Sequence, residues 1–142
     1  MNDEIERLIA AAERGDAEAA CRLGERYRQG RDGVRHSPRQ AYHWYARSAL
    51  AGDPQGQNNL GACYEHGLGC RQSYAHALKW YRLAAAQACP VATSNLGFCY
   101  LHGHGVRADL IEAVRWFMLA VEQGNEDARK TLEGLQFNQG KE

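Results

Sequence analysis

The chain has 142 residues, and its 17 lysines and arginines are balanced by 17 aspartates and glutamates. This length fits one domain, and the zero net charge argues against a nucleic-acid-binding protein, which would need a basic excess on one face. No apolar run approaches the length of a membrane span, so we expect no membrane partner.

The start of the chain predicts a cytoplasmic protein. Residues 1–7 are acidic and helical in character, and they lack the basic start and the apolar stretch of a secretory signal. The five cysteines are an odd number, which favours reduced thiols. A mature form whose signal has been trimmed is the alternative.

The first predicted element is a helix from about residue 3 to residue 14, with Ile5, Leu8 and Ala12 on one face. Gly15-Asp16 follows it, much as Gly52-Asp53 follows a later helix. The segment lacks the tryptophan of the later units. We therefore interpret residues 1–15 as a capping half-repeat at the N-terminus.

The first full unit, residues 16–52, predicts two helices separated by a loop over residues 30–36. Ser37 and Gln40 form a capping-box pattern at the start of the second helix, with Pro38 in its first turn. The loop is one residue longer than in the later units, and insertions in repeat arrays usually fall in loops.

The second unit, residues 53–88, predicts helices over about 54–66 and 73–87. Leu60 and Tyr64 lie four residues apart on one face of the first helix, and Gly67 suits the left-handed turn at its end. The second helix carries an apolar stripe at helical spacing. Its members are Ala77, Trp80, Tyr81, Ala84 and Ala85.

The third unit, residues 89–124, starts its first helix at Pro90. Asp109 and Glu112 predict a capping box for its second helix. Residues 125–138 continue the first-helix pattern without its glycine and tyrosine, so we interpret them as a capping half-repeat at the C-terminus. The count is eight helices, and no strand pattern is present.

One pattern recurs in the three units. Each contains Leu-Gly-x-x-Tyr-x-x-Gly followed by Ala-x-x-Trp-Tyr or Ala-x-x-Trp-Phe, and Trp44, Trp80 and Trp116 are 36 residues apart. This period is typical of helical-hairpin repeats. It predicts an all-α fold, a right-handed α-solenoid in a single domain over residues 1–142. The tryptophans are expected in the core, so Trp80→Ala should cost about 3–5 kcal/mol.

The repeated pattern resembles the Sel-one-like repeat family over roughly residues 16–136. These relatives of the tetratricopeptide repeats have a longer loop and occur in bacteria and eukaryotes. The resemblance implies a non-enzymatic adaptor that holds a peptide or another protein, with no cofactor. One secreted bacterial branch links the helices of each repeat by a disulfide. Ala85 and Ala92 occupy the matching places here, so that pairing is not carried over.

The resemblance to tetratricopeptide arrays also implies that the first helix of each unit lines a concave face. Its exposed positions are those outside the Leu-Gly-Tyr packing. The predicted partner-binding residues are Asn58, Asn59, Ala62, Glu65, His66, Ser94, Asn95, Phe98, Leu101 and His102. Further positions on this face are Glu18, Cys21, Glu25, Arg28, Gln29, Gln55, Val91, Asp127 and Lys130.

Phe98 and Leu101 are large apolar residues where the repeat pattern requires no packing. With Phe137 they would form an apolar patch of the kind that marks partner sites. The alternative is that they pack against the C-terminal capping helix.

Asn59 and Asn95 each precede the Leu-Gly pair. In peptide-binding tetratricopeptide arrays an asparagine at this place can hold the backbone of an extended ligand, since its amide both donates and accepts. The alternative is a local hydrogen bond to the neighbouring helix end.

A thiol- or metal-dependent protein is the alternative function. His66 and His102 follow Cys63 and Cys99 by three residues, a spacing that places Cys and His on one side of a helix. Cys70, in a loop near His66, is the candidate exposed thiol, but a nucleophilic cysteine also needs an orienting group.

Self-association is a third hypothesis. Phe137 and the N-terminal helix could meet a second copy, so the oligomeric state is left open between a monomer and a weakly associating protein.

Overall fold

The computed structural model describes residues 3–139 of the chain, with side chains described through residue 135. Residues 3–139 form eight helices and no strand, which confirms the predicted all-α repeat solenoid. In chain order the helices are α1 (Asp3–Glu13), α2 (Ala17–Gln29), α3 (Pro38–Leu50), α4 (Pro54–His66), α5 (Tyr74–Ala86), α6 (Pro90–His102), α7 (Leu110–Glu122) and α8 (Glu126–Gln139).

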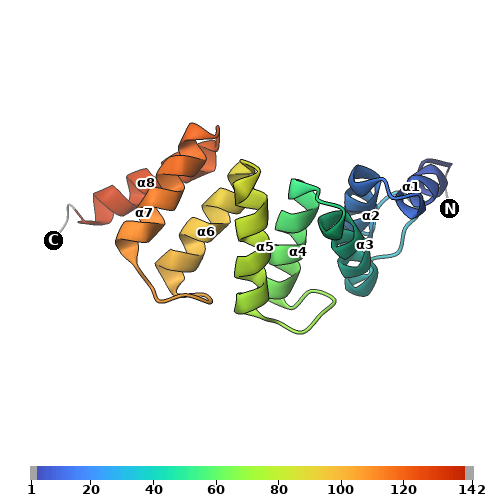
Figure 1. Cartoon of the computed structure of the whole chain (residues 1–142), viewed down its shortest axis with the longest axis horizontal. Coiled ribbons are helices and arrows are strands. Elements are labelled where there is room, and N and C mark those ends of the chain that lie inside the picture. The colour runs from blue at the N-terminus through green and yellow to red at the C-terminus, as the bar shows by residue number, and fades with distance from the viewer. Residues whose placement is uncertain (1–2, 140–142) are drawn as a thin grey trace.

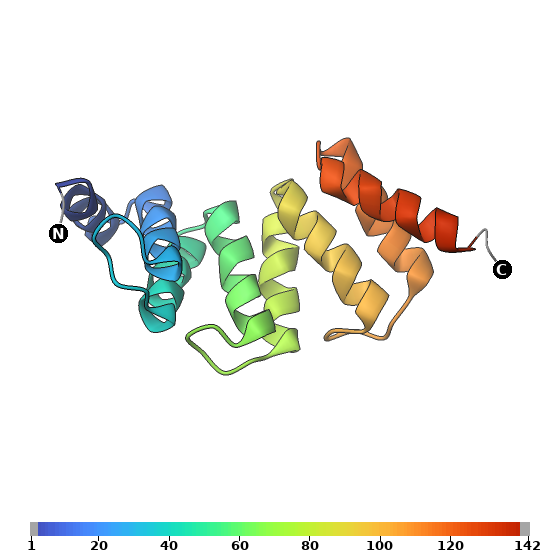
Figure 2. The ribbon, with the colours of Figure 1, turned by 180° about the vertical axis from the view of Figure 1, so that it is seen from behind.

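The helices form a row of stacked hairpins, with the two termini at opposite ends (Figure 1). Each helix packs against the next along the chain, and α2 also contacts α4. The second helices of the hairpins, α3, α5 and α7, lie toward the viewer in Figure 1. The first helices, α2, α4 and α6, lie together with α8 on the opposite side (Figure 2). We call that side the first-helix face, and the other the second-helix face.

Side-chain caps fix where the second helices begin. Ser37 Oγ accepts from the Gln40 N–H at 3.2 Å, and Asp109 Oδ1 accepts from the Glu112 N–H at 3.1 Å. These bonds satisfy backbone donors that have no partner inside a helix. The Asp109 bond is one half of the predicted capping box. The Glu112 carboxylate instead pairs with Arg115 at 3.1 Å, so the expected return bond to the backbone of residue 109 is replaced by an ion pair within α7.

The first helices of the hairpins end as the sequence predicts. Gly67 has φ 69°, and the equivalent Gly30 and Gly103 have φ 68° and 73°. Each donates its N–H back to the helix it ends, in the left-handed conformation that glycine adopts without steric cost.

The repeated Leu-Gly pair sets the distance between the two helices of a hairpin. A Cβ at Gly61 would lie 2.7 Å from two ring carbons of Tyr81, and one at Gly97 would lie 2.7 Å from the ring of Phe117. Glycine therefore lets the aromatic ring of the second helix lie directly on the backbone of the first.

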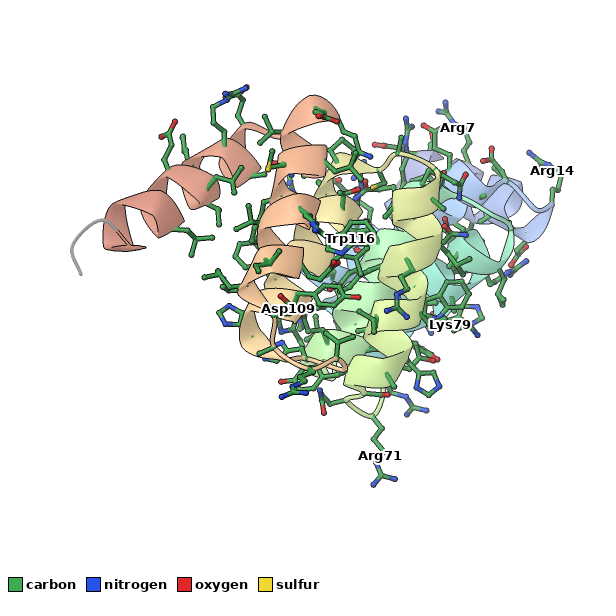
Figure 3. The ribbon with its side chains drawn as sticks, turned by 60° about the vertical axis from the view of Figure 1, so that its left-hand side comes forward. Arg7, Arg14, Arg71, Lys79, Asp109 and Trp116 are labelled. Carbon is green, nitrogen blue, oxygen red and sulfur yellow. The ribbon has the colours of Figure 1, made fainter. Side chains whose placement is uncertain are left out.

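The core aromatic of each repeat is the residue after the tryptophan. Tyr45, Tyr81 and Phe117 are almost fully buried, whereas Trp80 and Trp116 are only half-buried. The expectation of three core tryptophans is wrong for these two. Trp116 is only half-buried because it lies between α7 and α5, at the junction of two hairpins (Figure 3). It packs there against the edge of the core cluster formed by α5 and α6.

None of the described helices combines the length and the apolar composition that crossing a membrane requires.

Candidate partner-binding surface

All ten predicted partner-binding residues lie on α4 and α6, which are neighbours on the first-helix face (Figure 2). Hydrogen bonds join the helices of this face directly. Asn95 Nδ2 donates to Asn58 Oδ1 at 2.9 Å between α6 and α4, and Asn59 Nδ2 donates to Cys21 Sγ at 3.5 Å between α4 and α2. The first helices therefore contact one another as well as their hairpin partners.

Asn58 and Ser94 are not exposed, contrary to the sequence-based expectation. They are 4% and 7% accessible, and the equivalent Cys21 of the first repeat is also buried. Asn58 and Cys21 each accept a hydrogen bond from the neighbouring first helix, and Ser94 lies at the base of α6 where it faces α8. A side chain buried between neighbouring helices holds the array together and is covered before any partner arrives.

The asparagines before the Leu-Gly pairs are used within the fold. Asn59 is half-buried, donates to Cys21 and accepts from Gln55 Nε2 at 3.4 Å. Asn95 is half-buried and donates to Asn58. The local alternative has the support of these contacts, although the bonds reach the neighbouring first helix rather than a helix end.

Phe98 and Leu101 pack within the protein, against a cluster that belongs mainly to the hairpin partner α7 and includes only Ala128 of the capping helix that the alternative named. Both lie against the cluster formed by Ala113, Phe117, Ala120 and Ala128. The Phe98 and Phe117 ring centroids are 4.9 Å apart in an edge-to-face arrangement. Both residues remain half-buried, so one side of each stays accessible. The third predicted member of the patch, Phe137, lies outside the described side chains.

Glu65 occupies the point where α4 meets the next loop. Its side chain is 15% exposed and accepts a hydrogen bond from the Tyr81 hydroxyl at 2.9 Å. His66 Nε2 and His104 Nδ1 lie 3.6 and 3.8 Å from its carboxylate oxygens. His66 is the exposed member of this group. Glu65 is half-buried and bonded to Tyr81, so its carboxylate has a structural role between α4 and α5.

A shallow groove of about 520 Å³ runs between α6 and the first turn of α8. It is lined by Pro90, Val91, Ser94, Asn95, Phe98, Gly124, Asn125, Glu126 and Asp127. Asn125 joins its two sides, because Asn125 Nδ2 donates to the Pro90 carbonyl at 3.1 Å and Asn125 Oδ1 accepts from the Ala128 N–H at 3.0 Å.

The sequence analysis missed four members of this groove, Pro90, Gly124, Asn125 and Glu126. Asn125 follows Gly124 and precedes the last helix, a pattern that predicts a helix cap. The pattern therefore predicts that Asn125 caps the last helix, as its bond from the Ala128 N–H shows. The groove itself depends on α6 and α8 lying side by side.

Burial raises the pKa of four of the five cysteines, which argues against a nucleophilic role for them. Burial raises the pKa values of Cys21, Cys63 and Cys99 to about 12, with the carboxylate of Glu25 adding to the effect at Cys21. Burial also raises the pKa of Cys70, whose Sγ lies 3.5 Å from the Cys63 carbonyl oxygen. A reactive cysteine has a lowered pKa, so these shifts run against the thiol hypothesis.

The described residues do not support the metal hypothesis. In the part of the chain that the structure describes, no group of three or more His, Cys, Asp or Glu side chains is placed to hold one ion. Cys63 and Cys99 are buried inside the hairpins, whereas His66 and His102 are exposed.

The fold and this surface together define a scaffold of helical-hairpin repeats. The Sel1 repeat family model matches residues 17–53, 54–89 and 90–125, and the chain belongs to the Sel1 repeat family. Proteins of this family are generally protein-interaction scaffolds and are typically non-catalytic.

Solved structures carry the same fold. The protective antigen c5321 of uropathogenic Escherichia coli is 39% identical, with a TM-score of 0.85 over 94% of this chain. This chain spans only 28% of that antigen. A Sel1 repeat protein from Oxalobacter formigenes is 34% identical, with a TM-score of 0.79 over 94% of this chain and 99% of its own.

A third similar structure shows the fold alone. Cysteine rich protein B of Helicobacter pylori is 22% identical, with a TM-score of 0.68 over 89% of this chain and 96% of its own. No curated protein sequence matches this chain.

Proposed function

We propose that this protein is a non-enzymatic adaptor that binds an extended peptide or protein segment along its first-helix face. One observation carries the proposal. On this face the Leu-Gly pair that recurs in every repeat is buried, whereas several accessible positions change chemistry from one repeat to the next.

Two sets of equivalent positions illustrate the difference. The exposed set is Glu18, Gln55 and Val91, and the half-buried set is Glu25, Ala62 and Phe98. A side chain that only supports the repeat has the same task in every copy, so it recurs. Variation at accessible sites on neighbouring helices supports a surface that recognises a partner.

The test compares two exposed apolar residues on opposite faces. Val91 on α6 is 47% exposed and Leu83 on α5 is 43% exposed, so a glutamate at either site disturbs folding to a similar extent. The full chain and its Val91→Glu and Leu83→Glu variants are used for affinity capture from a lysate of the source organism. We expect the unchanged chain and the Leu83→Glu variant to capture the same partner, and we expect the Val91→Glu variant to lose it.

Loss of the partner with Leu83→Glu alone would place binding on the second-helix face. Retention by both variants would remove Val91 from the interface and count against the proposal. Circular dichroism of each variant shows whether its helices are intact.

We also propose a cytoplasmic location, which the odd number of cysteines supports because unpaired thiols persist in reducing compartments.

A further inference from the structure

We infer that the groove between α6 and α8 binds an apolar side chain of the partner next to a lysine or arginine. This inference rests on the proposed function. It specifies which side chains of the bound segment would contact the groove between α6 and α8.

The α6 side of the groove carries two large apolar side chains, Val91 and Phe98, beside the polar Ser94 and Asn95. Val91 is exposed, and Phe98 presents one side to the groove while its ring packs edge-to-face on Phe117. A partly exposed ring held by a core aromatic loses little conformational freedom on binding, so it makes an efficient anchor for an apolar side chain.

The α8 side of the groove is acidic. Glu126 and Asp127 line it, and no basic side chain is among its lining residues. Glu126 Oε2 lies 3.4 Å from Arg129 Nε, but both side chains are more than half exposed, so water screens that pair. The two carboxylates lie in the first turn of α8, where they offset the positive end of the helix dipole. An acidic partner would therefore be repelled, and a lysine or arginine would be attracted.

The groove is formed before a partner binds. Asn125 ties the start of α8 to the Pro90 carbonyl of α6, and Asn95 is tied to Asn58 of α4. Because the Asn125 bond joins the two sides of the groove and the Asn95 bond anchors α6 to α4, little reorganisation opposes binding.

The same junction one repeat earlier lacks this chemistry. There Gln55 and Ala62 stand in the places of Val91 and Phe98, and Pro90 and Val91 stand in the places of Glu126 and Asp127. The pairing of an aromatic wall with an acidic wall is thus a property of the α6–α8 junction and not of the repeat.

The test uses phage-displayed random dodecapeptides selected on the full chain. We expect the enriched peptides to carry an aliphatic or aromatic residue within three positions of a lysine or arginine, more often than the unselected library does. Synthetic copies of these peptides are then titrated by fluorescence polarisation.

The titrations use one charge variant and a matched control. The double variant E126Q/D127N keeps the shape of the groove and removes both charges, and we expect it to weaken binding at least tenfold. The control E6Q/E13Q removes two exposed carboxylates from α1, at the other end of the array, and should change affinity less than twofold (Figure 1). Phe98→Ala should also weaken binding, with circular dichroism as the check that it folds.

Three results would overturn the inference: enrichment of peptides without basic residues, equal binding by E126Q/D127N and the unchanged chain, or no enrichment. If binding is instead lost with Gln55→Ala or His66→Ala, the inference fails and the proposed function stands. If the enriched peptides ignore every substitution on the first-helix face, both fail.

Discussion

The Tyr81 hydroxyl donates a hydrogen bond to the Glu65 carboxylate at 2.9 Å, from α5 to α4. In the first repeat the equivalent contact is Arg28 Nε donating to the Tyr45 hydroxyl at 3.2 Å. In the third repeat the aromatic is Phe117, which has no hydroxyl, and Leu101 stands where Arg28 and Glu65 stand. The side chain on the first helix is thus polar where the ring is a tyrosine and apolar where it is a phenylalanine.

This relationship predicts coupling between positions 65 and 81. Tyr81→Phe should destabilise the chain by about 1–2 kcal/mol, because the Glu65 carboxylate loses a donor. Glu65→Leu should cost about 1–3 kcal/mol, because it leaves a buried hydroxyl unpaired. The double variant reproduces the Phe117–Leu101 pair and should cost at least about 1 kcal/mol less than the sum of the single changes. Urea unfolding of the four proteins measures this difference, and simple additivity would refute it.

The helix contact at Gly61 predicts a penalty for adding one methyl group. A Cβ there would lie 2.7 Å from the Tyr81 ring, so Gly61→Ala should destabilise the chain by about 1–3 kcal/mol. Gly134 is the matched control, because it is exposed in α8 and no atom lies within 4 Å of an added Cβ. Gly134→Ala should stabilise by about 0.5–1 kcal/mol through its better helix propensity. Thermal unfolding of both variants tests the pair, and equal signs would contradict the packing account.

The different burial of Trp80 and Tyr81 predicts different costs of truncation. Tyr81 is almost fully buried, so Tyr81→Ala should cost about 3–5 kcal/mol. Trp80 is half-buried and has Lys79 Nζ 5.4 Å from its ring centroid, so Trp80→Ala should cost about 1–3 kcal/mol. Chemical denaturation gives both values. A larger loss for Trp80 would restore the tryptophan as the principal core residue.

The buried thiols predict loss of stability in alkaline solution. Cys21, Cys63 and Cys99 have pKa values raised from 9.0 to about 12 by burial. Between these limits the folded chain keeps protons that the unfolded chain releases, so the free energy of unfolding falls as the pH rises and is unaffected by these groups at lower pH. Each thiol contributes a slope of about 1.4 kcal/mol per pH unit.

Cys63→Ala isolates one of these contributions. Between pH 10 and pH 11 the free energy of unfolding of this variant should fall less steeply than that of the unchanged chain. The two slopes should differ by about 1.4 kcal/mol per pH unit. Denaturant unfolding at fixed pH values measures the slope. An identical slope would mean that the Cys63 thiol ionises equally in the folded and unfolded chain.

Thiol accessibility gives a separate prediction. Cys70 is half-buried in a loop, whereas the other four cysteines are buried. With a maleimide at pH 7.5 and under native conditions, we expect one thiol to react at least tenfold faster than the rest, and Cys70→Ser to remove that fast phase. A fast phase that survives Cys70→Ser would place the accessible thiol elsewhere.

The residue sequence alone determined the repeat architecture. The 36-residue spacing of Trp44, Trp80 and Trp116, the caps at Ser37 and Asp109, and the glycine at Gly67 predicted hairpins that the structure confirms. These signals are local, because helix periodicity and capping depend on residues within a few positions of one another.

The tertiary structure decided which side chains of those helices are free. Asn58 and Ser94 are buried, Asn58 in a hydrogen bond with Asn95 of the neighbouring first helix, and Phe98 packs on Phe117 of its hairpin partner. Glu126 joins Val91 in one groove only because α8 lies beside α6. Burial at these positions depends on residues about 20 to 40 positions away, so a helical pattern gives the face of a helix but not what covers it.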